Sequence, residues 1–267
     1  ILMKIGYFCN TTNWKKKPYT QILDEARDIA VYCDKNGWDS IWFTEHHLNH
    51  EGMESCANPL MIGTDIAART NKIRIGQACN VITFWNPIRL AEDIAALDHL
   101  SNGRVEVGVG RGIYGREALH MNVEADLKDQ AKNKRLFEET LTIMKKAWTE
   151  KFFSHQGEFY TYPTPDFVWQ HDMSPPKEDF VDLKTNKLKK ISVVPQPHQK
   201  PHPPIWQVVD SPSSIDRAAK IGINCIMRIP TVKSLKKRFE IYKNAKSETE
   251  KREVHMGEGI CLVRDLF

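Results

Sequence analysis

Residues 40–47 read SIWFTEHH, an apolar run that passes directly into a carboxylate and two imidazoles. A short apolar run of this kind is typical of a strand buried on both faces of a parallel sheet. Polar side chains directly after such a strand are typical of α/β barrels, which keep their chemistry at the carboxyl ends of the strands. The stretch therefore predicts an α/β barrel with Glu45, His46 and His47 at its mouth.

The same alternation of short apolar runs and helical segments continues along the chain. Ile22, Ala26, Ile29 and Cys33 share one helical face, and Asn86-Pro87 is typical of an N-cap with proline at the first helical position. That second signal predicts a helix that ends near residue 100. The predicted strands are 5–9, 40–44, 73–82, 105–109, 205–209, 225–229 and 259–263. Strands alternating with helices indicate a parallel sheet with crossover helices.

Residues 151–204 interrupt this pattern, because they hold nine of the fourteen prolines and show no sustained helical face. We expect an insertion over the barrel mouth, before the fifth strand, that begins with a hairpin at 152–162. A plain linker is the alternative. Seven strands are predicted, whereas the usual barrel has eight strand-helix units. The predicted fold class is α/β, a single (β/α)8 TIM-type barrel domain over 1–267 that is shortened or truncated after the seventh strand.

Composition excludes several functional classes. The formal net charge is only +4 and the basic clusters are scattered, so the sequence does not predict nucleic-acid binding. No signal-peptide pattern opens the chain, and no stretch approaches the roughly 18 apolar residues of a membrane span. We therefore expect a cytoplasmic protein without membrane contact. The six cysteines show no CxxC or zinc-finger spacing and are predicted to be reduced, mostly buried thiols.

Glu45, His46 and His47 are the first candidates for catalysis. Adjacent residues of a strand point to opposite faces, so the two histidines are poorly placed to hold one metal ion, and no metal is predicted. An imidazole titrates near physiological pH and suits proton transfer, and Glu45 could orient one of the two rings. A structural histidine packed at the barrel rim is the alternative.

Two segments are candidates for phosphate binding. The glycine-rich run 108–115 does not fit a dinucleotide loop in the register that begins at Gly108, because Ile113 stands where the third glycine belongs. It does let backbone approach a ligand, and the Arg111 guanidinium could bind phosphate. The hydroxyl-rich turn 210–214 precedes a predicted helix, whose N terminus could also bind phosphate. An ordinary surface arginine and plain N-capping are the alternatives.

Four stretches in order resemble the bacterial-luciferase-like flavin-dependent monooxygenases. They are GWDSIWFTEHH at 37–47, NPIRLAED at 86–93 with LDHLSNGR at 97–104, GRGIY at 110–114, and PIWQVVDS at 204–211. The resemblance extends from Lys4 to about Arg264. Any one of these stretches would be a weak signal, whereas the ordered set is specific.

The resemblance implies an oxidoreductase that takes reduced FMN from a separate flavin reductase. With dioxygen, the flavin would form a peroxide that oxygenates a small, apolar organic substrate. Homodimerisation is a further expectation. Two alternatives are a deazaflavin-dependent oxidoreductase that transfers hydride and a flavin-binding protein without catalytic activity.

The resemblance also implies roles for individual residues. His46 would be the active-site histidine beside the flavin. Three residues would bind the flavin phosphate, namely Arg111, Ser211 and Ser214. Two more would flank the flavin, namely Tyr114 and Asp210. Ala78-Cys79 lies where members of the family have a bulge, often with a non-prolyl cis peptide, that supports the flavin face. Glu117 aligns where members carry an acidic residue, and the 151–204 insertion would cover the substrate pocket.

Overall fold

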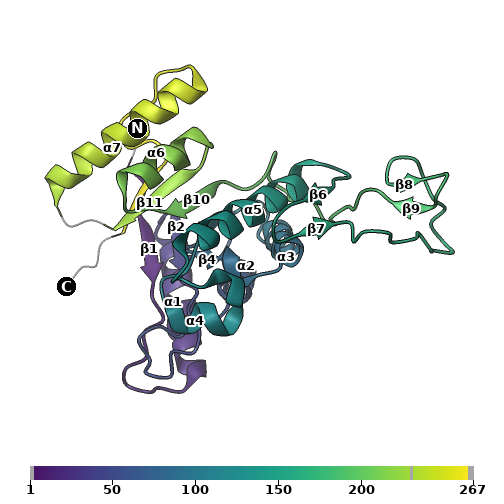
Figure 1. Cartoon of the computed structure of the whole chain (residues 1–267). Helices are drawn as coiled ribbons and strands as arrows, with labels where there is room; N and C mark the ends of the chain where they lie inside the picture. Colours follow the sequence, from purple (N-terminus) through teal and green to yellow (C-terminus); the bar gives the residue numbers. More distant parts are fainter. Residues whose placement is uncertain (1–2, 229–230, 264–267) are drawn as a thin grey trace. The chain divides into compact units, whose positions relative to one another are not determined.

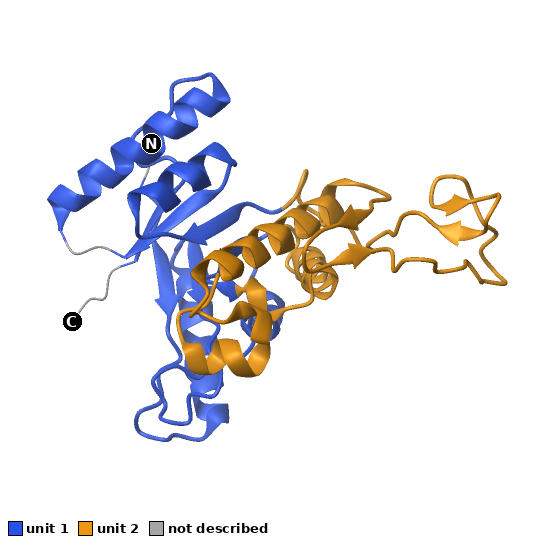
Figure 2. Cartoon of the chain, in the orientation of Figure 1, with its two compact units in different colours: residues 1–80, 104–110, 203–267 blue, residues 81–103, 111–202 orange. Residues whose placement is uncertain are grey.

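The computed structural model describes residues 3–228 and 231–263. The chain divides into two compact units, coloured separately in Figure 2. Unit 1 comprises Ile1–Asn80, Arg104–Gly110 and Pro203–Phe267, and unit 2 comprises Val81–Gly103 and Arg111–His202. Each unit is described by itself below. That residues 1–267 form a single domain stays a prediction.

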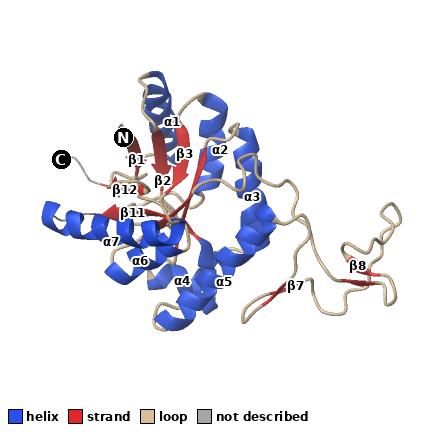
Figure 3. Cartoon of the chain, turned by 90° about the horizontal axis from the view of Figure 1, so that it is seen from above, coloured by secondary structure: helices blue, strands red, loops and turns tan. Residues whose placement is uncertain are grey.

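A parallel sheet forms the core of unit 1 (Figures 1 and 3). Within the described residues, seven of the eight strands of this sheet follow one another in chain order, as in a barrel with one βα unit fewer than usual. The fifth of them follows the proline-rich insertion, so the predicted fold class is confirmed. The strands are β1 (Gly6–Cys9), β2 (Ser40–Phe43), β3 (Arg74–Gln77), β5 (Val105–Gly110), β10 (Ile205–Val208), β11 (Asn224–Arg228) and β12 (Ile260–Val263).

The predicted strand over 73–82 is wrong in extent. Strand β3 ends at Gln77, and the short strand β4 (Asn80–Val81) and the 3-10 helix η1 (Ile82–Phe84) follow it. The Asn80 side chain donates to the Gln77 side chain (3.2 Å) and to the Gly108 carbonyl (3.1 Å). The apolar pattern of this segment runs on after β3 ends, and therefore could not show where the strand stops. The last residue of the predicted strand 225–229 lies outside the described residues.

Four helices of unit 1 cover the sheet or one another. They are α1 (Tyr19–Lys35), α2 (Pro59–Arg69), α6 (Pro212–Lys220) and α7 (Val232–Glu250). Helices α1 and α2 contact β2, α2 also contacts β3, and α6 contacts β11 and α7 (Figure 3). Helix α1 buries Ile22, Ala26 and Cys33 as its sequence pattern predicts, while Ile29 is half-buried.

Large side chains interlock on one face of the sheet. Gly76 lies beside the Trp42 ring, which would overlap any Cβ at position 76, so this position requires glycine. Trp42 packs edge-to-face on Trp206 with 5.6 Å between ring centroids. The Trp206 Nε1 donates to Glu106 (2.6 Å), and Glu106 also pairs with Arg74. The buried carboxylate therefore has two donors, which offsets the cost of burying its charge.

A buried arginine ties the start of β5 to the end of α2. The Arg104 guanidinium donates to the carbonyls of Ala67 (3.0 Å), Thr70 (3.0 Å) and Ile73 (2.8 Å), and to the Thr70 hydroxyl (3.0 Å). The Asp34 carboxylate accepts from the backbone N–H of Ile73 and of the two residues before it. Side chains thus satisfy the backbone groups of this turn.

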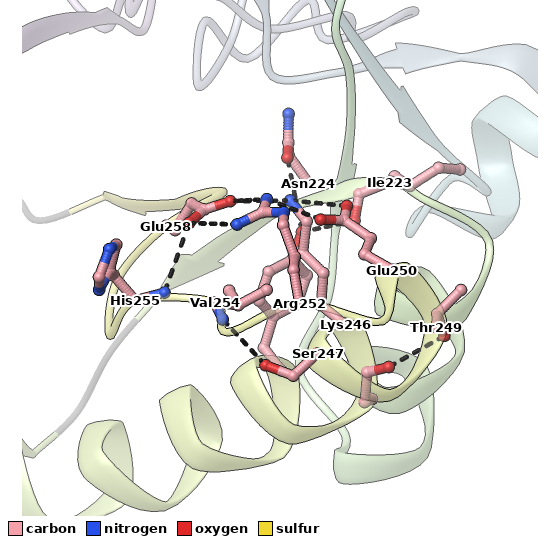
Figure 4. A network of polar contacts seen from close by, with 12 residues as sticks. Ile223, Asn224, Lys246, Ser247, Thr249, Glu250, Arg252, Val254, His255 and Glu258 are labelled. Atoms are coloured by element: carbon pink, nitrogen blue, oxygen red, sulfur yellow. Dashed lines mark hydrogen bonds and ion pairs between the residues drawn. The ribbon is translucent and has the colours of Figure 1, made fainter.

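A polar network closes the end of α7 onto the segment that leads to β12 (Figure 4). Arg252 lies between Glu250 (2.6 Å) and Glu258, with which it makes two contacts. Lys246 lies 3.8 Å and 3.9 Å from the same two carboxylates. The Arg252 guanidinium lowers the pKa of Glu258 to about 2. The network therefore holds a carboxylate in its charged form.

Unit 2 is built on two helices packed together, α3 (Pro87–Leu100) and α5 (Gln130–Thr149), with α4 (Gly115–Met121) and the 3-10 helix η2 (Val123–Ala125). The prediction for α3 is confirmed, because the Asn86 side chain caps the N–H groups of Ile88 and Arg89. The Trp148 Nε1 donates to the Ala91 carbonyl (3.0 Å) and joins α5 to α3.

The insertion lies in unit 2 and contains two short hairpins, as the fold of residues 151–202 shows in Figure 1. The first joins β6 (His155–Gln156) to β7 (Thr161–Tyr162) and confirms the predicted hairpin; the second joins β8 (Val181–Asp182) to β9 (Lys187–Leu188). The Glu139 carboxylate of α5 accepts from the N–H groups of the first hairpin's turn at 158–160 and contacts His155 (2.9 Å). The first hairpin is thus anchored to α5. A role as a lid stays a prediction.

The six cysteines are free, as the sequence predicts. Four are buried and two, Cys79 and Cys261, are partly exposed. Among the described residues, no helix combines the length and the apolar character needed to cross a membrane.

Candidate functional site

The residues directly after β2 form two acid–imidazole pairs in unit 1. Glu45 is 2% exposed, and its Oε1 lies 2.9 Å from the Nε2 of His47. The sequence predicts that Glu45 orients one of the two histidine rings, and the structure pairs it with His47.

His46 has a different acidic partner. Its Nε2 lies 2.7 Å from the Oε2 of Glu54, and its backbone N–H donates to the Cys56 carbonyl (2.8 Å). Both side chains are largely buried. Sequence reasoning missed Glu54, because a glutamate inside a loop has no spacing rule that connects it to a histidine eight residues earlier. The one sequence signal for such a partner was an acidic residue in the loop that follows β2.

Cys79 lies opposite Gly110 in unit 1. The Ala78–Cys79 peptide is a non-prolyl cis peptide, as the resemblance implies. A Cβ at Gly110 would overlap the Cys79 Sγ, so the backbone at the end of β5 is bare where it faces this thiol. Although the residue as a whole is partly exposed, desolvation of its thiol, and then the charge of Glu45, raise the pKa of Cys79 to about 12. Cys79 is therefore a neutral thiol at physiological pH.

The serine turn caps helix α6. The Ser211 Oγ accepts from the Ser214 N–H (3.2 Å) and lies 2.8 Å from the Ser214 hydroxyl and 3.1 Å from the Ser213 hydroxyl. The N-cap that the sequence offered as the alternative to a phosphate site is confirmed. The hydroxyls of Ser211 and Ser213 are exposed beside the positive end of the helix dipole, and Ser214 is half-buried. This arrangement suits an anion such as phosphate.

Asp210 lies directly before this turn and is highly exposed. Its Oδ1 lies 2.9 Å from the Nη1 of Arg238, a residue of α7 that sequence reasoning missed. The Arg238 Nη1 also donates to the Arg228 carbonyl (3.4 Å). A cation therefore lies close to the start of α6.

Arg111 and Tyr114 belong to unit 2. The Arg111 Nη1 donates to the Asn133 Oδ1 (3.4 Å) and to the Gln130 carbonyl (3.5 Å). The buried Asn133 Nδ2 donates in turn to the Arg111 carbonyl (3.3 Å), so one amide on α5 contacts both ends of the arginine. Tyr114 is the residue before α4, and Glu117 is buried within that helix. Sequence reasoning missed Asn133, which belongs to an ordinary amphipathic helix.

The glycine run at 108–115 contains a second register that the sequence prediction did not consider. Gly110, Gly112 and Gly115 do match the dinucleotide spacing, in a register that begins two residues after Gly108. The structure nevertheless disagrees with that motif. The helix after the glycines has seven residues, and α5 occupies the region about 20 residues on, where a dinucleotide fold has a strand ending in an acid.

Comparisons with known proteins agree with this architecture. The family described as "Luciferase-like monooxygenase" matches residues 3–176. The oxygenase component of flavin-dependent trigonelline monooxygenase from Acinetobacter baylyi is 30% identical over 204 residues, which are 76% of this chain and 48% of that protein. This chain thus spans about half the length of that relative.

Solved structures also share the fold of this chain, and two of them are informative. One is the FMN-bound oxygenating constituent of 3,6-diketocamphane monooxygenase from Pseudomonas putida, with a TM-score of 0.77 and 20% identity over 98% of this chain and 66% of that one. The other is an F420-dependent secondary alcohol dehydrogenase, with a TM-score of 0.71 and 18% identity over 98% of this chain and 68% of that one. Because the family match extends over more than half of the chain and the fold agrees, the chain belongs to the luciferase-like monooxygenase family.

Proposed function

We propose that the protein is a flavin-dependent monooxygenase that uses dioxygen and reduced FMN from a separate reductase to oxygenate a small, apolar organic molecule. The observation that carries the proposal is the set of groups at the carboxyl ends of three unit 1 strands. These groups are the His46–Glu54 pair after β2, Cys79 after β3, and the serine turn after β10. The trigonelline enzyme's designation as an oxygenase component supports a separate reductase.

The residues of unit 1 fit a flavin. The exposed serine hydroxyls and the α6 N terminus suit its phosphate. Gly110 makes room for the Cys79 side chain, which lies at the carboxyl ends of β3 and β5. The buried Thr44 Oγ1, directly after β2, has no hydrogen-bond partner within the described part of the chain and could donate to a ligand. Reduced flavin, when bound, supplies the electrons that activate dioxygen.

The roles proposed for the protein's own residues follow from their chemistry. His46 would hold and move a proton, and Glu45 would keep the neighbouring His47 in place. Arg111, Ser211 and Ser214 would bind phosphate, and Cys79, Tyr114 and Asp210 would flank the flavin. The insertion at 151–204 would exclude water from the reacting atoms.

The test is a reaction of the purified protein with reduced FMN and air. Dioxygen uptake and the return of oxidised-flavin absorbance are followed together after anaerobic mixing. The proposal predicts that dioxygen is consumed before oxidised flavin returns, and that His46→Ala lowers turnover while reduced FMN still binds. Uptake and flavin oxidation that coincide at the rate of free flavin would contradict it.

The phosphate contacts are tested by comparing two ligands. Arg111→Ala should weaken FMN binding much more than riboflavin binding, because only FMN carries a phosphate. Ser211→Ala should do the same. Equal losses for FMN and riboflavin would exclude a phosphate role.

A second candidate is hydride transfer with a deazaflavin, which the fold shared with the F420-dependent alcohol dehydrogenase favours. It predicts far tighter binding of reduced F420 than of reduced FMN. A flavin-binding protein without catalysis predicts tight binding of oxidised FMN and no turnover. Homodimerisation and a cytoplasmic location stay predictions.

A further inference from the structure

Two glutamates and two adjacent histidines form separate pairs after β2. Glu45 pairs with His47 at 2.9 Å, and Glu54 pairs with His46 at 2.7 Å. The two contacts involve different carboxylates. One of these acids lies just after β2, and the other lies in the loop that follows.

The loop that carries Glu54 is fixed on both sides of it. The Gly52 carbonyl accepts from the Asn13 N–H (2.7 Å), and Gly52 has a φ of +91°, with a Cβ position that the Asn13 carbonyl would overlap. On the other side, the Ser55 N–H donates to the Thr11 carbonyl (3.2 Å). The Glu54 backbone is therefore held between two attachments to the segment after β1.

The side chain of Glu54 needs its imidazole partner. Its Oε2 is buried and, within residues 3–228 and 231–263, has no hydrogen bond of regular angle, while His46 Nε2 lies 2.7 Å away. A buried carboxylate is costly unless it is paired. At this distance, a protonated Nε2 that donates to Oε2 would satisfy the buried carboxylate.

We propose that Glu54 is the positioning residue of His46, an inference that rests on the proposed function of His46 as the proton-transfer group. A carboxylate beside Nε2 keeps the proton of the neutral ring on Nε2, so Nδ1 becomes the nitrogen that accepts a proton. This is the arrangement in which a third group orients a catalytic base. Glu45, by contrast, positions the non-reacting neighbour His47.

The experiment compares Glu54→Gln with Glu51→Gln in the full chain. Gln preserves the shape of Glu54 and removes its charge. Glu51 is a matched control, because it is a glutamate in the same loop and its side chain is 44% exposed, compared with 15% for Glu54. Long-range 1H–15N NMR reports which ring nitrogen carries the proton, and His46→Gln identifies the His46 signals. Flavin reoxidation is measured in parallel with FMN as the probe.

We expect the ratio of Nε2–H to Nδ1–H at His46 to fall about tenfold in Glu54→Gln and to stay unchanged in Glu51→Gln. The rate of the His46-dependent step should fall by about the same factor, with the FMN dissociation constant within about twofold. An unchanged tautomer ratio, or an equal change in both variants, would overturn the proposal. If the tautomer shifts but the wild-type chain shows no oxygenation, the positioning role stands and the proposed function fails.

Discussion

Gly110 faces the Cys79 thiol so closely that adding one methyl group should destabilise unit 1 measurably. A Cβ at position 110 would overlap the Cys79 Sγ. The backbone of Gly110 has a φ outside the left-handed region, so Gly110→Ala tests packing and not backbone strain. Overpacking of this kind costs about 1–3 kcal/mol.

The structure also predicts how to relieve the clash. With Cys79→Ala, the nearest Cys79 atom to the new methyl group is the Cβ at 3.6 Å, which is an ordinary contact. Cys79→Ala alone removes one buried atom and should cost about 1 kcal/mol. The double variant should therefore cost about 1 kcal/mol as well, so the coupling energy is about −1 to −3 kcal/mol.

The assay is urea unfolding of the wild type, both single variants and the double variant. Gly108→Ala is the control, because its Cβ would overlap the backbone carbonyl oxygen of Gln77, which no side-chain truncation can move. Cys79→Ala should not rescue that variant. If the two costs for Gly110 and Cys79 simply add within about 0.5 kcal/mol, the clash with the thiol does not exist and the reasoning is refuted.

Three further predictions concern stability. Arg252 lowers the pKa of Glu258 from 4.5 to about 2, so the stabilisation from this pair is complete above pH 4.5 and is lost as the pH falls toward 2. At pH 7, Glu258→Gln should therefore unfold at a lower urea concentration than the wild type. This difference in urea midpoint should close as the pH falls from 4.5 toward 2. Arg104→Met leaves buried carbonyls without their donor and should cost about 3 kcal/mol or more by urea unfolding, whereas Arg69→Met, whose partner is on the surface, should cost under about 0.5 kcal/mol. Glu139→Ala frees the turn at 158–160 and should speed its cleavage by protease at least severalfold, and an unchanged cleavage rate would exclude the anchor.

The sequence predicts the fold because the signals for strands and helices are local. The helix from Pro87 and the cap at Ser211 were predictable from a few neighbouring residues. The partners Glu54, Asn133 and Arg238 were not, because each meets its target through tertiary contact. For the same reason, strand alternation predicted that the two histidines diverge but could not predict which of them Glu45 contacts.

The anchor of the first hairpin has a consequence for how this protein can change. Glu139 contacts the turn through backbone N–H groups, which every residue except proline provides. Substitutions other than proline at 158–160 therefore keep the contacts with Glu139, whereas a change at Glu158 also removes its own ion pair with Arg135 of α5 (2.7 Å). A protein built in this way can acquire new side chains on the hairpin by single substitutions while one glutamate on α5 keeps the loop in place.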